Sequence, residues 1–158
     1  LVKNVEQARN TLTQRTEGPT CRAEVLLDTS HMKPGDYAGL VALQYYYGTV
    51  GVEMDDRGER YVVMCTRGED GEQRAVARVP YSQAEVRLKI DFDFRDRTDT
   101  AQFFYSADGE KWEKIGEPLQ LKYTLHHFMG CRIGLFYYAT QHTGGHVDFD
   151  YFRYEKGS

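Results

Sequence analysis

The stretch VRLKIDFDF, residues 86–94, alternates apolar and charged side chains without a break. Successive side chains of a β-strand point to opposite faces, so this period of two predicts a strand with one buried face and one solvated face. The stretch TCRAEVLLD, residues 20–28, alternates in the same way, with Cys21, Ala23, Val25 and Leu27 on one side. A chain built from such segments is expected to fold as a layered β structure.

The same reading along the chain predicts many short strands separated by Gly, Pro and Asp turns. Only NVEQARNTL, residues 4–12, could form a turn or two of helix. The expected fold class is all-β, an antiparallel two-sheet β-sandwich of the jelly-roll kind, with under about 10% helix. The predicted strands lie near residues 10–16, 20–28, 37–44, 48–55, 59–67, 73–79, 84–94, 100–106, 111–115, 131–141 and 146–155.

Length and charge narrow the function classes. The 158 residues fit a single module, 1–158, that can bury its own core. The net charge is −4, and the charged residues form no long run of one sign, which argues against a nucleic-acid partner. No apolar stretch is long enough for a membrane span. The three cysteines, at 21, 65 and 131, are expected to be buried free thiols rather than a disulfide or metal framework. The start at Leu1, with neither Met nor a signal peptide, is typical of a mature or excised chain and says nothing about export.

Aromatic side chains are concentrated near the end of the chain. Residues 127–154 hold eight of the twenty Tyr and Phe. Flat rings can cover the apolar face of a sugar ring, and planar polar groups can bond its hydroxyls, so a carbohydrate-binding face is one interpretation. Packing in a sandwich core is the other, and both can hold on opposite faces of the same strands.

The alternation selects candidate sugar-binding residues. In strand 131–141, Ile133, Leu135 and Tyr137 are expected inside, which places Tyr138 on the outer, accessible face as a stacking ring. In QYYYG, residues 44–48, either Tyr46 alone or Tyr45 with Tyr47 can be exposed. The hydroxyl partners are expected at outward positions of other strands, namely Arg22, Glu24, Gln44 and Lys89.

Two pairs of acids lie two residues apart on a strand face. Asp91 and Asp93 alternate with basic residues, which is typical of a solvated charged face rather than of a catalytic pair. Asp148 and Asp150 are interpreted either as part of a structural network or as ligands of a structural calcium ion, since calcium prefers oxygen ligands. No cofactor is required, no catalytic residue is predicted, and none of the common catalytic motifs is present.

Five segments together resemble one family. They are NVEQARNTLTQRTEGPTCRAEVLLD, GDYAGLVALQYYYGTVGVEM, FFYSADGEKWEKIGEPLQLKYTL, HFMGCRIGLFYYAT and GGHVDFDYFRY. In order and spacing they are similar to the C-terminal module of glycoside hydrolase family 43 β-xylosidases, a concanavalin-A-like β-sandwich that follows a five-bladed catalytic propeller. The resemblance covers about Asn4 to Tyr154.

The chain departs from the family pattern in two main ways. The propeller and its carboxylates are absent from these residues, so hydrolysis does not carry over to this chain. The family module also has further residues ahead of this start, so the chain either begins after a first strand of the module or is a shortened variant. The family often has Asn at the position of Tyr137, which leaves any family role of that residue open.

Three hypotheses for the function of the chain remain open. The leading one is a non-catalytic carbohydrate-binding module directed to xylan or xylo-oligosaccharides and attached to a β-xylosidase or arabinofuranosidase. The second is a structural accessory domain that packs on the catalytic propeller and shapes the mouth of its active site. The third is a free-standing jelly-roll glycanase or lyase, for which Arg22 to Glu24 offers only a partial motif. The compartment is left open, with a secreted or periplasmic location favoured over the cytoplasm.

Overall fold

A computed structural model describes residues 12–15, 20–43, 47–67, 72–95, 100–121, 132–142 and 144–156. These ranges contain eleven β-strands, and each overlaps a strand predicted from the alternation. The strands are β1 (Leu12–Arg15), β2 (Thr20–Asp28), β3 (Asp36–Leu43), β4 (Tyr47–Met54), β5 (Arg60–Arg67), β6 (Gln73–Pro80), β7 (Glu85–Asp93), β8 (Thr100–Ser106), β9 (Glu113–Gln120), β10 (Arg132–Ala139) and β11 (Asp148–Lys156).

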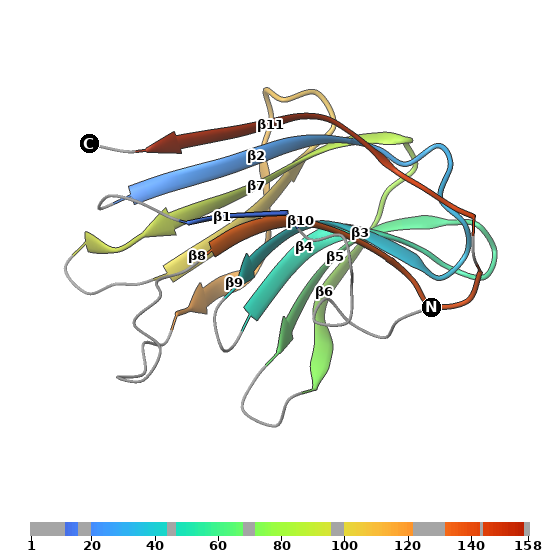
Figure 1. The fold of residues 1–158 in the computed structure, drawn as a ribbon, viewed down its shortest axis with the longest axis horizontal. Helices are drawn as coiled ribbons and strands as arrows, with labels where there is room; N and C mark the ends of the chain where they lie inside the picture. Colours follow the sequence, from blue (N-terminus) through green and yellow to red (C-terminus); the bar gives the residue numbers. More distant parts are fainter. Residues whose placement is uncertain are drawn as a thin grey trace.

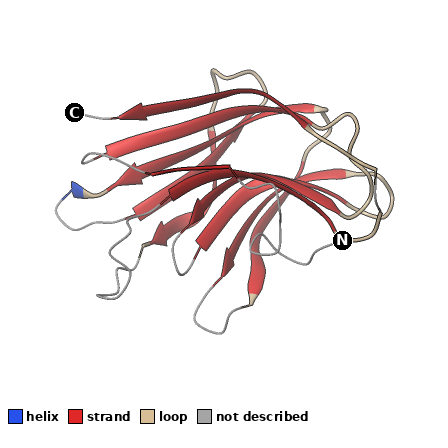
Figure 2. Ribbon diagram, viewed as in Figure 1, coloured by secondary structure: helices blue, strands red, loops and turns tan. Residues whose placement is uncertain are grey.

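The strands form two antiparallel sheets that pack as a sandwich (Figure 1). Sheet A has the order β1-β10-β3-β4-β5-β6, and sheet B has the order β11-β2-β7-β8-β9. The all-β fold class is therefore confirmed. Figure 2 shows almost only strands and loops, with one helical piece, at Arg95. Within the described ranges, no helix has the length and apolarity needed to cross a membrane.

The core between the sheets is built from the inward positions of the alternating strands. Val86, Leu88, Ile90 and Phe92 of β7 are all at most 2% exposed, as predicted, while Phe94 is only partly buried at the end of the strand. From β2 the same core receives Cys21, Ala23, Val25 and Leu27. Burial of this much apolar surface is the main source of stability in a sandwich of this size.

A second buried cluster lies on the other face of sheet A, which we call the outer face. Its members come from the odd positions of β3, β4 and β5 and the even positions of β10, which alternate with the core residues. The strand pattern of residues 59–67 predicts Val63 in the core near Phe92, but Val63 belongs to this outer cluster, so that prediction is wrong. Its neighbour Val62 is in the core instead. The outer cluster consists of Tyr37, Val41, Tyr47, Val63, Cys65, Phe136 and Tyr138.

The last strand departs from simple alternation. The register of β11 against β2 shifts between Phe149, which pairs with Leu27, and Tyr151, which pairs with Leu26. Simple alternation predicts that Phe149 and Tyr151 share a face, but this bulge places Phe149 on the core side and Tyr151 on the solvent side, so that prediction is wrong. Phe152 then lies opposite the core residue Val25, but it is 37% exposed because β11 is the edge strand of sheet B.

Candidate functional site

The predicted sugar-binding residues lie on two opposite outer faces of the sandwich. Arg22 and Glu24 of β2 and Lys89 of β7 are at outward positions of sheet B. Tyr138 of β10 is in the outer cluster of sheet A. These four residues therefore do not form one site, and that expectation is wrong. Gln44 and Tyr46 lie outside the described residues.

Tyr138 is on the predicted face, but its ring is not accessible. The residue is only 5% exposed, and its ring centroid lies 5.8 Å from that of Tyr37 and 5.9 Å from that of Phe136. Its hydroxyl accepts a hydrogen bond from Nε2 of Gln73 at 2.7 Å. The ring is thus a packing element of the outer cluster and cannot stack on a sugar in this arrangement.

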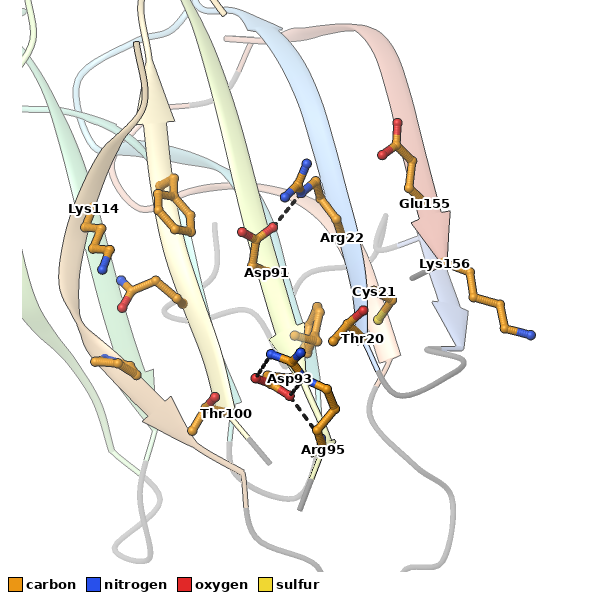
Figure 3. Close-up of a pocket in the computed structure, with 14 residues that line it drawn as sticks. Thr20, Cys21, Arg22, Asp91, Asp93, Arg95, Thr100, Lys114, Glu155 and Lys156 are labelled. Carbon is orange, nitrogen blue, oxygen red and sulfur yellow. Dashed lines mark hydrogen bonds and ion pairs between the residues drawn. The ribbon is translucent and has the colours of Figure 1, made fainter. Parts of the chain in front are cut away.

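A large hollow on the described surface is a groove over sheet B, which we call the sheet B groove. It has a volume of ≈ 670 Å³, within the range of about 300–1,000 Å³ typical of small-ligand sites. Its walls come from β2, β7, β8, β9 and the end of β11 (Figure 3). The charged and aromatic side chains that line it include Arg22, Asp91, Asp93, Arg95, Phe104 and Lys114.

Two pairs of opposite charges lie in the sheet B groove. Nε of Arg22 donates to Oδ1 of Asp91 at 2.7 Å, and Arg95 donates to both carboxylate oxygens of Asp93 at 3.0 and 2.9 Å (Figure 3). The hydrogen bonds from Arg95 lower the pKa of Asp93 to about 2. Each pair fixes planar groups in place through charged hydrogen bonds. The side chains of Arg22 and Asp91 remain 49% and 33% exposed.

Lys89 has a different role from the one predicted. Its Nζ lies 4.5 Å from the ring centroid of Phe104 and 4.3 Å from that of Trp112, and the residue is only 7% exposed. Burial lowers the pKa of Lys89, while Asp91 opposes that shift. Two cation–π contacts of this kind hold both rings against the sheet. Lys89 therefore orients aromatic rings beside the groove and offers a ligand little surface of its own.

Glu24 extends the paired pattern toward the edge of sheet B. Its Oε2 accepts a hydrogen bond from the hydroxyl of Tyr151 at 2.6 Å. Its cross-strand neighbours are Arg153 and Lys89, both basic. Acidic and basic residues thus alternate across the strands of this face, which satisfies its charges internally. The carboxylates of Asp91, Asp93 and Glu24 on this face each accept a hydrogen bond, from Arg22, Arg95 and Tyr151 respectively.

Asp148 and Asp150 both lie on β11 and are exposed. Asp148 pairs with Asp28 of β2, and Asp150 falls at the bulge. In the described part of the chain, no three His, Cys, Asp or Glu side chains gather in a way that could hold a metal ion. Any calcium bound here would rely on backbone carbonyls and water for most of its six to eight oxygen ligands. Calcium binding at this edge stays a prediction.

Sequence reasoning missed several groove residues. Phe104, Gln102 and Lys114 all face outward on strands that the alternation identified. The missing information was the pairing of β7 with β8 and of β8 with β9, which brings them beside Asp91. The cysteine expectation is confirmed for Cys21 and Cys65, which are buried and free, whereas Cys131 lies outside the described residues.

The comparisons with known proteins identify the class of domain. Residues 3–155 match the family model described as the C-terminal concanavalin-A-like domain of β-xylosidases. The chain belongs to this family, as its sequence segments suggested. The match extends over nearly all of the 158 residues and leaves no room among them for a catalytic propeller.

Individual relatives agree with the family match. A β-xylosidase from Formosa agariphila is 28% identical over 150 residues, which are 94% of this chain and 24% of that protein. A bifunctional GH43-CE protein from Bacteroides eggerthii is 46% identical, with a TM-score of 0.92 over 100% of this chain and 20% of its own. An engineered GH43 glycoside hydrolase with endo-xylanase and exo-arabinofuranosidase activity is 29% identical, with a TM-score of 0.85 over 94% of this chain and 31% of its own. The chain thus spans less than a third of the length of each of these relatives.

Proposed function

We propose that this chain is the non-catalytic accessory domain of a longer glycoside hydrolase of family 43, and that it binds xylan or xylo-oligosaccharides in the sheet B groove. Support for the first part comes from the family match and from the greater length of the relatives. Their names refer to β-xylosidase, endo-xylanase and arabinofuranosidase activities, which makes xylan the polymer to test.

The observation that carries the binding proposal is the pairing of charges inside an open groove. A neutral polyhydroxylated ligand gains little from a lone charge, but it bonds well to planar groups that are already fixed. Arg22 and Asp91 are such groups, and the half-exposed ring of Phe104 lines the same groove. Sheet B thus provides both polar partners and an aromatic surface, whereas the single site predicted from the sequence combined residues that lie on two different sheets.

Affinity electrophoresis in xylan gels, with reducing-sugar release measured on the same samples, tests the proposal. Retardation without sugar release is the expected result. Calorimetry with xylohexaose should give a dissociation constant around 10⁻⁴ M, corresponding to about −5.5 kcal/mol. The double variant Arg22→Ala/Asp91→Ala should weaken binding at least about tenfold, because charged hydrogen bonds contribute about 1.5–3 kcal/mol each.

A matched control keeps the comparison fair. The double variant Glu110→Ala/Lys111→Ala also removes one charge of each sign, from an exposed turn that does not line the groove. It should bind xylohexaose like the unchanged protein. If both double variants bind equally well, the sheet B groove is not the site, and release of reducing sugar would instead support the enzyme alternative.

The second candidate function is a structural one, in which the domain packs on a catalytic domain. The length of the relatives favours it, since all three contain much more chain than this domain. The aromatic rings of sheet A do not supply the interface, because Phe136 and Tyr138 are already buried within this chain. No retardation by xylan and no sugar release would favour this structural role.

A further inference from the structure

The opposite face of the sandwich carries a separate, smaller cleft, which we call the sheet A cleft. It has a volume of ≈ 380 Å³ and lies over the outer cluster, near the start of β3 and the end of β10. This volume is at the lower end of the range for small-ligand sites and suits one or two sugar rings rather than a polymer. The cleft is lined by Gly35, Tyr37, Glu53, Met54, Asp55, Asp56, Cys65, Gln73, Tyr138, Thr140 and Gln141.

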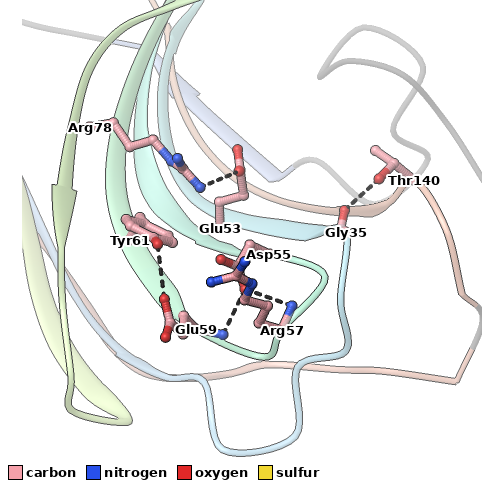
Figure 4. Close-up of polar contacts among 8 residues, drawn as sticks. All are labelled: Gly35, Glu53, Asp55, Arg57, Glu59, Tyr61, Arg78 and Thr140. Atoms are coloured by element: carbon pink, nitrogen blue, oxygen red, sulfur yellow. Dashed lines mark hydrogen bonds and ion pairs between the residues drawn. The ribbon is translucent and has the colours of Figure 1, made fainter.

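Three acidic residues, Glu53, Asp55 and Asp56, line the sheet A cleft, and the first two have local partners. Oδ1 of Asp55 accepts hydrogen bonds from the backbone N–H groups of Arg57 and Glu59 at 2.9 and 2.8 Å, which lower the pKa of Asp55 (Figure 4). Glu53 lies 3.7 Å from Arg78, whose guanidinium is centred 3.7 Å from the ring of Tyr61.

Glu53 nevertheless has capacity for a ligand. It is half-buried, and burial raises its pKa, with Arg78 opposing the shift. At 3.7 Å the contact with Arg78 is too long for a hydrogen bond, so the lone pairs of the carboxylate are not used up by it. In Figure 4 the carboxylate of Glu53 stands clear of the Asp55 turn. Glu53 can accept hydrogen bonds from hydroxyl groups at the cleft wall.

The floor of the cleft presents a complementary donor. The hydroxyl of Tyr138 accepts from Gln73, and among the described residues no acceptor receives its own proton. The neighbouring Tyr37 differs, because its hydroxyl donates to the carbonyl of Val63 at 2.9 Å and also bonds Oγ1 of Thr49 at 2.8 Å. A buried hydroxyl with an unused donor is costly unless something bonds it. Tyr138 can pair with an oxygen of a ligand seated in the cleft.

We propose that the sheet A cleft is a second saccharide-binding site, which takes a neutral mono- or disaccharide through the hydroxyl of Tyr138 and the carboxylate of Glu53. A donor on the floor and an acceptor on the wall match the paired donor and acceptor character of sugar hydroxyls. The site lies on the face opposite the sheet B groove and does not depend on the function proposed for that groove.

Binding of xylobiose to the Arg22→Ala/Asp91→Ala variant isolates this site, since that background removes the main polar groups of the sheet B groove. Calorimetry should still detect xylobiose there. Adding Tyr138→Phe keeps the ring and removes only the hydroxyl, and it should weaken the residual binding about three- to tenfold. Glu53→Gln should have a comparable effect. Tyr105→Phe, which removes a hydroxyl outside both hollows, should leave affinity unchanged.

Two buried thiols give a second readout of which hollow is filled. Cys65 lines the sheet A cleft, and Cys21 lines the sheet B groove. Xylobiose should slow the alkylation of Cys65 by a small thiol reagent, as followed by peptide mass spectrometry, and Tyr138→Phe should remove that protection. The proposal is overturned if the background variant binds no xylobiose, or if Tyr138→Phe and Glu53→Gln change neither affinity nor Cys65 protection.

Discussion

At the scale of single residues, the properties of this domain depend on polar groups that are fixed by close partners. Arg95 and Asp93 form a bidentate pair at the end of β7, and Arg22 and Asp91 form another pair two residues earlier on the strand. Tyr137 bonds a fully buried carboxylate, that of Asp36. These contacts hold the side chains in fixed positions on the strands.

The pKa of Asp93 is a direct test of the first pair. Hydrogen bonds from Arg95 lower this pKa from an ordinary value of 3.8 to about 2. A lowered folded-state pKa contributes stability that is present above about pH 4 and is lost as the pH falls through about 2. An NMR titration of the carboxyl carbon should show this value. Arg95→Ala should return the pKa toward 3.8, and an unchanged pKa in that variant would contradict the assigned cause.

The Asp36 site makes a prediction about stability. The hydroxyl of Tyr137 donates to Oδ2 of Asp36 at 2.8 Å, and the backbone N–H of Lys33 donates to the same oxygen. Oδ1 has no hydrogen-bond partner among the described residues. Tyr137→Phe should therefore cost about 1.5–3 kcal/mol in chemical denaturation, as for other hydrogen bonds to charged groups. Tyr105→Phe, whose hydroxyl makes a 3.4 Å exposed contact, should cost less than about 0.5 kcal/mol.

At the scale of strands, the sequence predicts the elements well and their surroundings less well. Strands β2 and β8 have the predicted bounds, because turn residues and strict alternation mark both ends. The bulge in β11 could not be predicted, since the alternation of Phe149, Asp150 and Tyr151 reads as continuous. The burial of Tyr138 was also hidden, because Tyr37 and Gln73 cover it from strands that are distant in sequence.

The core strand β7 offers a quantitative test of register. Phe92 is 2% exposed, so Phe92→Ala removes a large buried side chain and should cost about 3–5 kcal/mol in chemical denaturation. Phe152→Ala makes the same substitution at the exposed edge of sheet B and should cost much less. A loss below about 1 kcal/mol for Phe92→Ala would mean that β7 does not bury this face.

The edge strand β11 carries the calcium prediction. If Asp148 and Asp150 bind calcium, chelation should lower the melting temperature, because the ion stabilises only the folded state. At a hundredfold excess over its dissociation constant, the loss is about 2.7 kcal/mol, or roughly 5–10 °C for a chain of this size. The variant Asp148→Asn should melt at the lower temperature and no longer respond to chelator. A melting temperature that chelator does not change removes the calcium site.

At the scale of the whole molecule, the sandwich separates two surfaces by placing β3 to β6 in sheet A and β7 to β9 in sheet B, with the remaining strands divided between the two sheets. β2 and β7 lie in sheet B, whereas β3 and β10 lie in sheet A. The sequence predicted which side of β2, β7 and β10 faces outward, but it did not predict which strands share a sheet. For that reason Arg22 and Tyr138 were placed in one site, although each contributes to a different hollow.

The two candidate functions differ in what they predict for a longer enzyme that contains this domain. A binding module raises the local concentration of polymer at an attached catalytic domain, so its benefit appears on long substrates. With the Arg22→Ala/Asp91→Ala substitutions in the full-length protein, hydrolysis of insoluble xylan should fall several-fold, while hydrolysis of a soluble xyloside should be unchanged.

A structural module would behave differently in the same assay. Removing the whole domain would expose the surface of the catalytic domain that it covers and would reduce activity on both substrates. The Arg22→Ala/Asp91→Ala substitutions change only two groove residues on sheet B and leave the core and the outer cluster intact. They would then affect activity on neither substrate. The ratio of polymer hydrolysis to xyloside hydrolysis in the groove variant therefore separates the two functions. A lower ratio than in the unchanged protein supports binding in the groove. An unchanged ratio assigns this face no part in substrate recognition.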